Sequence, residues 1–147
     1  MTGPISVLVV DDDELDRYAV GRQLGKHPEI GRVVEVADGS EAYDLVAGER
    51  FESELGPHPP RTLILLDINM PLMSGFDFLE AVEREALLSS ADACVVVMLT
   101  SSSYFGDRER AEQFEVVGDY VEKPLRAPQI RSLIERFWPE HAAPAND

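Results

Sequence analysis

The chain has 147 residues, the size of one domain with a core large enough to fold alone. Its 28 acidic and 13 basic residues give a formal charge of -15 at pH 7, which repels nucleic-acid phosphates and anionic lipid head groups, so direct nucleic-acid binding is not expected. The longest uninterrupted apolar stretch covers residues 93–99, far short of the ~20 residues that cross a bilayer, so no membrane span is predicted.

The first predicted element is a β-strand at residues 5–10, an apolar run that ends in three aspartates. No basic region precedes this run, and a signal peptide would not tolerate the aspartates, so we expect a cytoplasmic protein. Leu15, Ala19, Val20 and Leu24 then recur at helical spacing. They predict a helix that lays an apolar stripe on the sheet.

The middle of the chain repeats this order of strand and helix. A second strand is predicted at residues 33–36, and Ser40 is the predicted N-cap of the helix that follows it. Residues 54–62, rich in glycine and proline, are expected to form a surface loop. A third strand at residues 63–66 leads to a third helix, which begins after Ser74.

Two further units of strand and helix complete the predicted fold. The fourth strand is expected at residues 94–99 and the fifth at residues 120–121. The mostly charged segment at about residues 107–117 predicts the helix between them. The last helix is expected to begin near Pro128, which suits a first helical turn, and to stop at Pro139.

Strands that alternate with helices are typical of βαβ units and a parallel sheet. The first, third and fourth apolar runs are nearly continuous Val, Ile and Leu, as expected when helices cover both faces of the sheet. The one cysteine, Cys94, lies in such a run and is expected to be buried. The sequence therefore predicts an α/β fold.

Polar residues gather where the predicted strands end. The aspartates at residues 11–13 follow the first strand, Asp67 the third, Thr100 the fourth and Lys123 the fifth. Ligands of an open parallel sheet bind at this edge. Clustered carboxylates repel by roughly 4 kcal/mol per pair at an effective dielectric of about 20, so they need a cation. Lys123 supplies one charge, and oxygen ligands without Cys or His favour Mg²⁺. Such a site suits phosphoryl transfer to a carboxylate.

Four motifs resemble the signatures of the receiver domain of two-component response regulators, over roughly residues 5–138. They are VVDD at 9–12, LLDINMP at 65–71 with Gly75, LTS at 99–101 and YVEKP at 120–124. The resemblance implies a flavodoxin-like, doubly wound (βα)5 fold with a five-stranded parallel sheet in the order 2-1-3-4-5. It also implies a receiver domain at residues 1–138 and a flexible C-terminal tail at residues 139–147.

The resemblance assigns the phosphoacceptor and the metal ligands position by position. Asp67 would take its phosphoryl group from the phosphohistidine of a sensor histidine kinase. Asp12, Asp67 and the backbone carbonyl of Asn69 would hold Mg²⁺, and Asp11 would reach the ion through water. Asp13 is a third acid in this run, and we expect it to point away as a helix cap.

The resemblance also assigns the residues that respond to the phosphoryl group. Thr100 would bond a phosphoryl oxygen, Lys123 would pair with it, and Tyr120 would be the aromatic switch that turns inward as Thr100 moves. Asn69 and Ser102 occupy the positions that tune dephosphorylation. The protein would then be a signalling switch with slow self-dephosphorylation, and not an enzyme.

Two segments resemble the stand-alone, phytochrome-associated branch of the family, residues 59–67 and residues 134–138. This resemblance implies a phytochrome-type kinase as partner. Phe137 and Trp138 either pack in the core or form a dimer contact. No effector domain follows residue 138, so we expect output through a downstream protein bound to the face of the fourth helix, fifth strand and fifth helix, which is also the expected surface of a homodimer.

Three alternatives remain open. Asp11 and Asp13 have the spacing of the nucleophile and acid of a haloacid-dehalogenase-type phosphatase, although Leu15 stands where that family has Thr or Val. A receiver-like module that binds partners without being phosphorylated would have lost an acid, the threonine or the lysine, and this chain keeps them all. A flavin site is disfavoured because the acids after the first strand would repel its phosphate.

Overall fold

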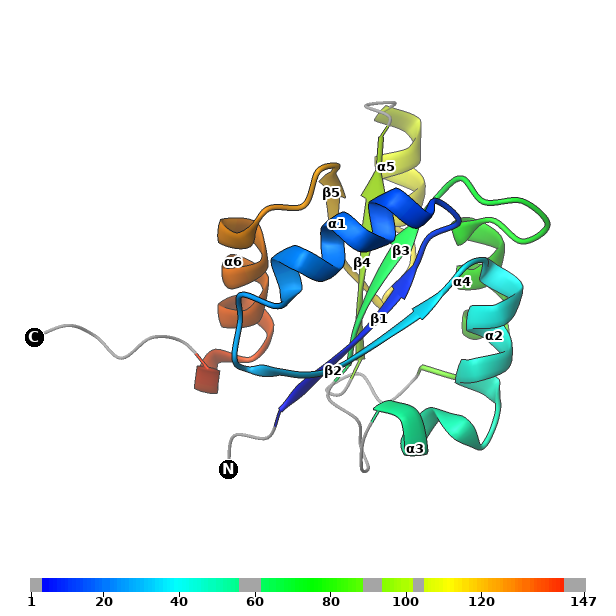
Figure 1. Ribbon diagram of the computed structural model, residues 1–147. Helices are drawn as coiled ribbons and strands as arrows, with labels where there is room; N and C mark the ends of the chain where they lie inside the picture. Colours follow the sequence, from blue (N-terminus) through cyan, green and yellow to red (C-terminus); the bar gives the residue numbers. More distant parts are fainter. Residues whose placement is uncertain (1–3, 56–61, 89–93, 102–104, 142–147) are drawn as a thin grey trace, which may run out of the picture.

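The computed structural model describes residues 4–55, 62–88, 94–101 and 105–141. Five parallel strands form one twisted sheet in the order β2-β1-β3-β4-β5, with helices on both faces (Figure 1). The strands are β1 Ile5–Val10, β2 Ile30–Val36, β3 Thr62–Asp67, β4 Cys94–Thr100 and β5 Val117–Glu122. The predicted α/β class and strand order are confirmed.

Six α-helices and a short 3-10 turn are present in the described residues. They are α1 Glu14–Leu24, α2 Gly39–Ala47, α3 Arg50–Leu55, α4 Gly75–Arg84, α5 Phe105–Ala111, α6 Ala127–Phe137 and η1 Pro139–His141. None of these helices is long and apolar enough to cross a membrane.

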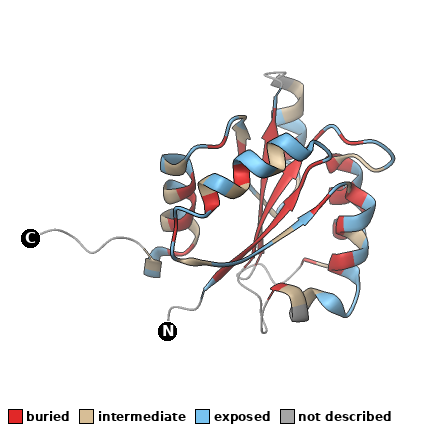
Figure 2. Cartoon of the chain, in the orientation of Figure 1, coloured by how far each residue is buried: buried red, intermediate tan, exposed pale blue. Residues whose placement is uncertain are grey.

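The sheet separates two hydrophobic cores because successive side chains of a strand point to opposite faces. Leu8 and Val10 of β1 pack in the core beneath α2, α4 and α5, whereas Val7 and Val9 pack in the core beneath α1 and α6. The central strands β1, β3 and β4 are therefore buried on both faces (Figure 2). Cys94 is buried in the first of these cores, as predicted.

The predicted apolar stripe of α1 is only half right. Val20 and Leu24 are buried in the second core, but Leu15 and Ala19 are exposed. The reason is that only the C-terminal half of α1 lies on this core. Its first turn carries acidic residues and lies near the carboxyl edge of the sheet.

Three predicted boundaries are wrong. Asp38, not Ser40, caps α2, because its carboxylate accepts the Glu41 N–H at 2.8 Å. The predicted 54–62 loop begins too early, because Leu55 still belongs to α3 and is buried in the core, and residues 56–61 lie outside the described part of the chain. The predicted helix at 107–117 ends at Ala111, and β5 begins at residue 117, where it pairs with β4.

The end of α6 closes the second core. Trp138 is buried there, so the packing alternative holds for this residue. Phe137 lies over Gly118 of β5, where a Cβ atom would collide with the phenylalanine ring and with Val95. A dimer contact by Phe137 stays a prediction.

Candidate functional site

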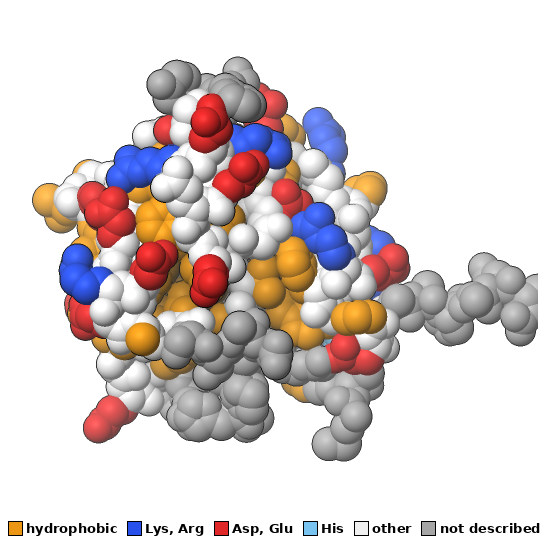
Figure 3. Space-filling model, turned by 180° about the vertical axis from the view of Figure 1, so that it is seen from behind, with side chains coloured by type: hydrophobic (Ala, Val, Ile, Leu, Met, Phe, Trp, Pro, Cys, Tyr) orange, Lys and Arg blue, Asp and Glu red, His pale blue; other side chains and the backbone are white. Residues whose placement is uncertain are grey.

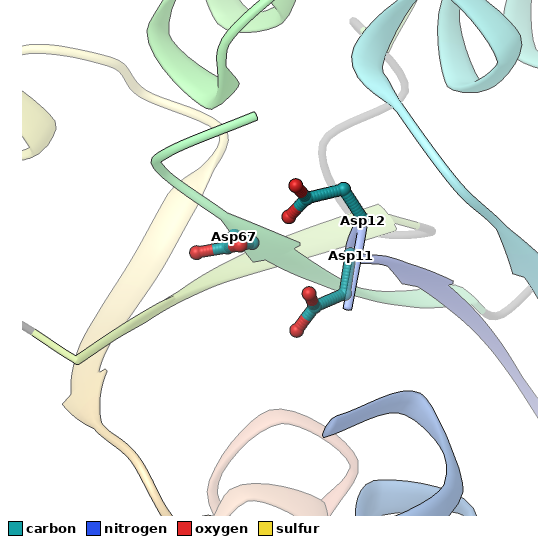
Figure 4. Close-up of side chains that lie close together, drawn as sticks. All are labelled: Asp11, Asp12 and Asp67. Atoms are coloured by element: carbon teal, nitrogen blue, oxygen red, sulfur yellow. The ribbon is translucent and has the colours of Figure 1, made fainter. Parts of the chain in front are cut away.

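Three carboxylates meet at the carboxyl edge of the sheet. β1 and β3 are neighbours, with Val10 paired to Leu66, so Asp11 and Asp12 after β1 lie beside Asp67 at the end of β3. One carboxylate oxygen from each aspartate lies within 4.8 Å of the others (Figure 4). Asp11 and Asp67 are buried and Asp12 is exposed, so this oxygen cluster is open to solvent on one side.

The environment of Asp67 opposes its negative charge. Burial is the largest cause and raises the pKa of Asp67 to about 6, with Asp11 adding to the rise. The positive charge of Lys123 and a hydrogen bond from the Asn69 backbone act in the opposite direction. A cation among the three aspartates would remove the repulsion that remains, and an all-oxygen donor set with one solvent-open side fits Mg²⁺.

Lys123 holds its ammonium group among carboxylates. Its Nζ lies 2.8 Å from Asp11 Oδ2, 2.8 Å from Asp16 Oδ2 and 3.8 Å from Asp67 Oδ2. Burial alone would lower the pKa of Lys123, but the bonds to Asp11 and Asp16 and the charge of Asp67 raise it above its usual value. The ammonium is therefore charged at neutral pH.

The backbone positions Lys123 for these contacts. Its N–H donates to the Thr100 carbonyl at 2.7 Å, and the Lys123–Pro124 peptide bond is cis. The turn after β5 is thereby attached to the end of β4. The lysine reaches the carboxylates from this turn.

Asp13 points away from the carboxylate cluster, as predicted. It is the N-cap of α1, and its Oδ1 accepts the N–H groups of Leu15 at 2.8 Å and Asp16 at 3.2 Å. Its own N–H donates to Asp11 Oδ1 at 2.9 Å. Because the Asp13 carboxylate is occupied by the helix terminus, it does not face Asp11 as the acid of a phosphatase would.

Asp16 is the site residue that sequence reasoning missed. It lies on the first turn of α1 and bonds the lysine ammonium directly. An acid at this position of a helix usually reaches back to the capping residue. The available signal was the acid three residues after Asp13, but its contact with a lysine 107 residues away cannot be predicted from local spacing.

Thr100 and Tyr120 lie on the side of the site away from β1. Thr100 is fully buried at the end of β4, and Tyr120 is buried on the neighbouring strand β5. Burial raises the pKa of the Tyr120 phenol, and the neighbouring Thr100 hydroxyl opposes this rise. The Arg108 guanidinium lies 5.2 Å from the centre of the tyrosine ring and donates to the Tyr120 carbonyl at 3.2 Å. The tyrosine ring is therefore turned inward.

The turn between β3 and α4 approaches Asp67 closely. The Gly75 N–H donates to the Ile68 carbonyl at 2.9 Å, and a Cβ atom at Gly75 would overlap the Asp67 backbone oxygen. Ser74 caps α4 in a reciprocal capping box with Asp77, as the predicted start of this helix requires.

Of the two residues expected to tune dephosphorylation, the structure describes Asn69. Asn69 is exposed in the turn after β3. Ser102 lies outside the residues that the structure describes. The role of these two residues in dephosphorylation stays a prediction.

Known proteins are similar to this chain in sequence and in fold. The pattern that defines the response regulator receiver domain matches residues 7–135. The response regulator MprA of Mycolicibacterium vanbaalenii is 31% identical over 145 residues, which cover 95% of this chain and 54% of that protein. The chain thus spans about half the length of this relative.

Solved structures agree with the sequence comparison. A two-component response regulator from Cytophaga hutchinsonii matches with a TM-score of 0.77 and 25% identity, over 92% of this chain and 97% of that one. The bacteriophytochrome response regulator AtBRR matches with a TM-score of 0.72 and 28% identity, over 97% of both chains.

Proposed function

The chain belongs to the response regulator receiver domain family of two-component systems, and from this premise we propose that Asp67 accepts a phosphoryl group from the phosphohistidine of a sensor histidine kinase. The observation that carries the proposal is a buried carboxylate at a strand end, which lies beside the carboxylates of Asp11 and Asp12 and 3.8 Å from the Lys123 ammonium. A carboxylate oxygen of Asp67 attacks phosphorus, the phosphorus–nitrogen bond breaks, and the electron pair leaves with the imidazole.

Asp11, Asp12 and Asp67 are the proposed protein ligands of a magnesium ion, together with the backbone carbonyl of Asn69. The support is the chemistry of the cluster, which offers three carboxylates and neither histidine nor cysteine. When bound, Mg²⁺ would neutralise charge on the phosphoryl oxygens during transfer. The Asp11 contact is proposed to run through water.

Thr100, Lys123 and Tyr120 are the proposed readout of phosphorylation. Lys123 would pair with the phosphoryl group, Thr100 would bond one of its oxygens, and Tyr120 would be held inward by the moved threonine. The phosphoryl group would shift an existing equilibrium between two conformations. The protein would be a switch that dephosphorylates itself slowly, at a rate tuned by Asn69 and Ser102.

The proposed output surface is the face formed by α5, β5 and α6. Hydrophobic side chains lie between charged ones when the molecule is viewed from behind (Figure 3). We propose that a downstream protein, or a second copy of this chain, binds this face. The receiver unit would end near residue 138, because Trp138 is the last of the described residues that lies in the buried core.

The kinase is proposed to be of the phytochrome type, and this protein is proposed to be cytoplasmic. The similarity to the bacteriophytochrome response regulator AtBRR supports this choice. It agrees with the resemblance of residues 59–67 and 134–138 to that branch of the family.

Incubation with the small phosphodonor acetyl phosphate and Mg²⁺ tests the proposal. Intact mass spectrometry should find one added phosphate per chain in the wild type and none in Asp67→Asn. Asp44→Asn, an exposed position on α2, is the matched control and should be labelled like the wild type. An unlabelled wild type, or labelling that survives Asp67→Asn, would contradict the proposal.

A further inference from the structure

We infer that Asp16 is a positioning residue, an inference that rests on the proposed function. Asp16 holds the Lys123 ammonium beside α1 and so weakens the electrostatic interaction between this ammonium and Asp67. Lys123 Nζ lies as close to Asp16 as to Asp11, at 2.8 Å from each, but 3.8 Å from Asp67. The lysine is therefore hydrogen-bonded to two carboxylates that are not the proposed phosphoacceptor.

The two hydrogen-bonded partners of Lys123 are not equivalent. The Asp11 side chain is 3% exposed and that of Asp16 is 43% exposed. Water can replace the lysine at Asp16, whereas Asp11 would be left as a buried charge without its partner. Asp16 is therefore the partner that Lys123 can release when a phosphoryl group appears on Asp67.

The position of Asp16 connects two parts of the fold around the site. Asp16 belongs to the first turn of α1, and its backbone N–H is held by the Asp13 cap at 3.2 Å. Lys123 belongs to the turn between β5 and α6, which is attached to Thr100. Release of Asp16 would free the lysine without breaking the helix cap.

Removal of the Asp16 charge should affect cations and anions in opposite directions. In Asp16→Asn one of the carboxylates that compete with Asp67 for the Lys123 ammonium is removed. The ammonium therefore interacts more strongly with Asp67 and with an anion bound there. The site also carries one negative charge fewer, so Mg²⁺ should bind more weakly. A partly exposed ion pair is worth up to about 1 kcal/mol, which corresponds to changes of about 2- to 5-fold.

The experiment measures two affinities in the whole chain by titration calorimetry. One is the affinity for Mg²⁺ alone, and the other is the affinity for the phosphoryl analogue beryllium trifluoride at saturating Mg²⁺. We expect Asp16→Asn to bind Mg²⁺ about 2- to 5-fold more weakly and the analogue about 2- to 5-fold more tightly. Asp16→Glu keeps the carboxylate and should restore both values toward the wild type.

Glu14→Gln is the matched control, because it removes one exposed charge from the same turn of α1. The inference would be overturned if Asp16→Asn had the same two affinities as Glu14→Gln. It would also be overturned if Asp16→Asn bound both Mg²⁺ and the analogue more weakly, because a loss of folded structure has that effect. A wild type that binds Mg²⁺ but not the analogue would overturn the proposed function instead. The two failures are therefore distinguishable.

Discussion

At the scale of single residues, Asp67 carries a charge that its surroundings disfavour. Its pKa is raised to about 6, mainly by burial, so the folded protein binds this proton more tightly than the unfolded chain does. The resulting stabilisation is present below the ordinary carboxyl pKa and is lost as the pH rises through about 6. In the absence of metal, the ionised Asp67 carboxylate therefore destabilises the folded protein at neutral pH.

The first prediction is that Asp67→Asn stabilises the metal-free protein. At pH 7 the free energy of unfolding should rise by about 1–3 kcal/mol, because a shift of one pKa unit corresponds to about 1.4 kcal/mol. The gain should shrink toward pH 4, where wild-type Asp67 is already protonated. Urea denaturation at both pH values measures this, with Asp44→Asn as control. A variant less stable than the wild type at pH 7 would contradict the electrostatic account.

The second prediction concerns Mg²⁺ and pH. A protonated Asp67 is a poor ligand, so the apparent Mg²⁺ affinity should fall by up to about tenfold per pH unit once the pH drops below about 6. Calorimetric titrations at pH 5 and pH 7.5 compare the two states. Equal Mg²⁺ affinities at both pH values would contradict the prediction that Asp67 must lose its proton in order to bind the ion.

Most single residues of the site could be predicted because they directly follow strands. Two things are enough to predict them: the ends of the strands, and the rule that parallel strands place these ends at one edge of the sheet. This holds for Asp11, Asp12, Asp67 and Lys123. Asp16 could not be predicted, because a helical residue shows nothing of which distant side chain it meets. The cap role of Asp13 agrees with the expectation for that residue, whereas the switch role of Tyr120 stays a prediction.

At the scale of elements, α6 is attached to the turn after α1 by one ion pair. Arg131 contacts both carboxylate oxygens of Glu29, with Nη1 2.6 Å from Oε2 and Nη2 2.8 Å from Oε1. The hydrogen bond from Arg131 lowers the pKa of Glu29 to about 2. The stabilisation from a lowered carboxyl pKa is present above the ordinary value of 4.5 and is lost as the pH falls toward 2.

The third prediction follows from this pair. Glu29→Gln should lower the free energy of unfolding by about 1–2 kcal/mol at pH 7, and the difference from the wild type should narrow as the pH falls from 5 to 3. Glu135→Gln is the control, because that carboxylate lies 4.0 Å from Arg131 on the same helix and is more exposed. Denaturation curves that show equal losses for both variants would contradict a specific role for Glu29.

The fourth prediction concerns the turn between β3 and α4. Gly75→Ala should lower the free energy of unfolding by about 1–3 kcal/mol and impair phosphorylation, because its Cβ atom would displace the Asp67 backbone. Gly21→Ala is the control, since apart from its chain neighbours and the backbone of α1 itself no described atom lies within 4 Å of a Cβ atom there. In the middle of α1 it should instead stabilise by about 0.5–1 kcal/mol. Thermal denaturation and acetyl phosphate labelling check both, and unchanged behaviour of Gly75→Ala would disprove the close approach.

The elements themselves were predictable to different degrees. β1, β3 and β4 are buried on both faces, so their apolar runs mark them clearly. The edge strand β5 mixes exposed and buried residues, so the sequence predicts only residues 120–121 of it as strand and assigns residue 117 to the preceding helix. The six-residue helix α3 has too few turns for a periodic apolar pattern, so the sequence does not predict it. Tertiary contacts stabilise it instead, such as the hydrogen bond from Ser6 Oγ to the Leu55 carbonyl.

At the scale of the whole molecule, one sheet supports two separate tasks. Its two cores hold the helices in place, and its carboxyl edge gathers residues from β1, β3, β4 and β5 into one site. The fold class was predictable because strand and helix alternate along the whole chain. Partner surfaces were not, because exposed side chains alone do not identify what binds them.

The central claim is that Asp67 carries the phosphoryl group, and borohydride trapping tests it most directly. After labelling with acetyl phosphate and Mg²⁺, borohydride reduces the aspartyl phosphate to homoserine, which peptide mass spectrometry locates in the chain. We predict homoserine at Asp67 and at no other aspartate. Homoserine at Asp11, the nucleophile of the phosphatase alternative, or at no position in a fully folded sample, would contradict the account.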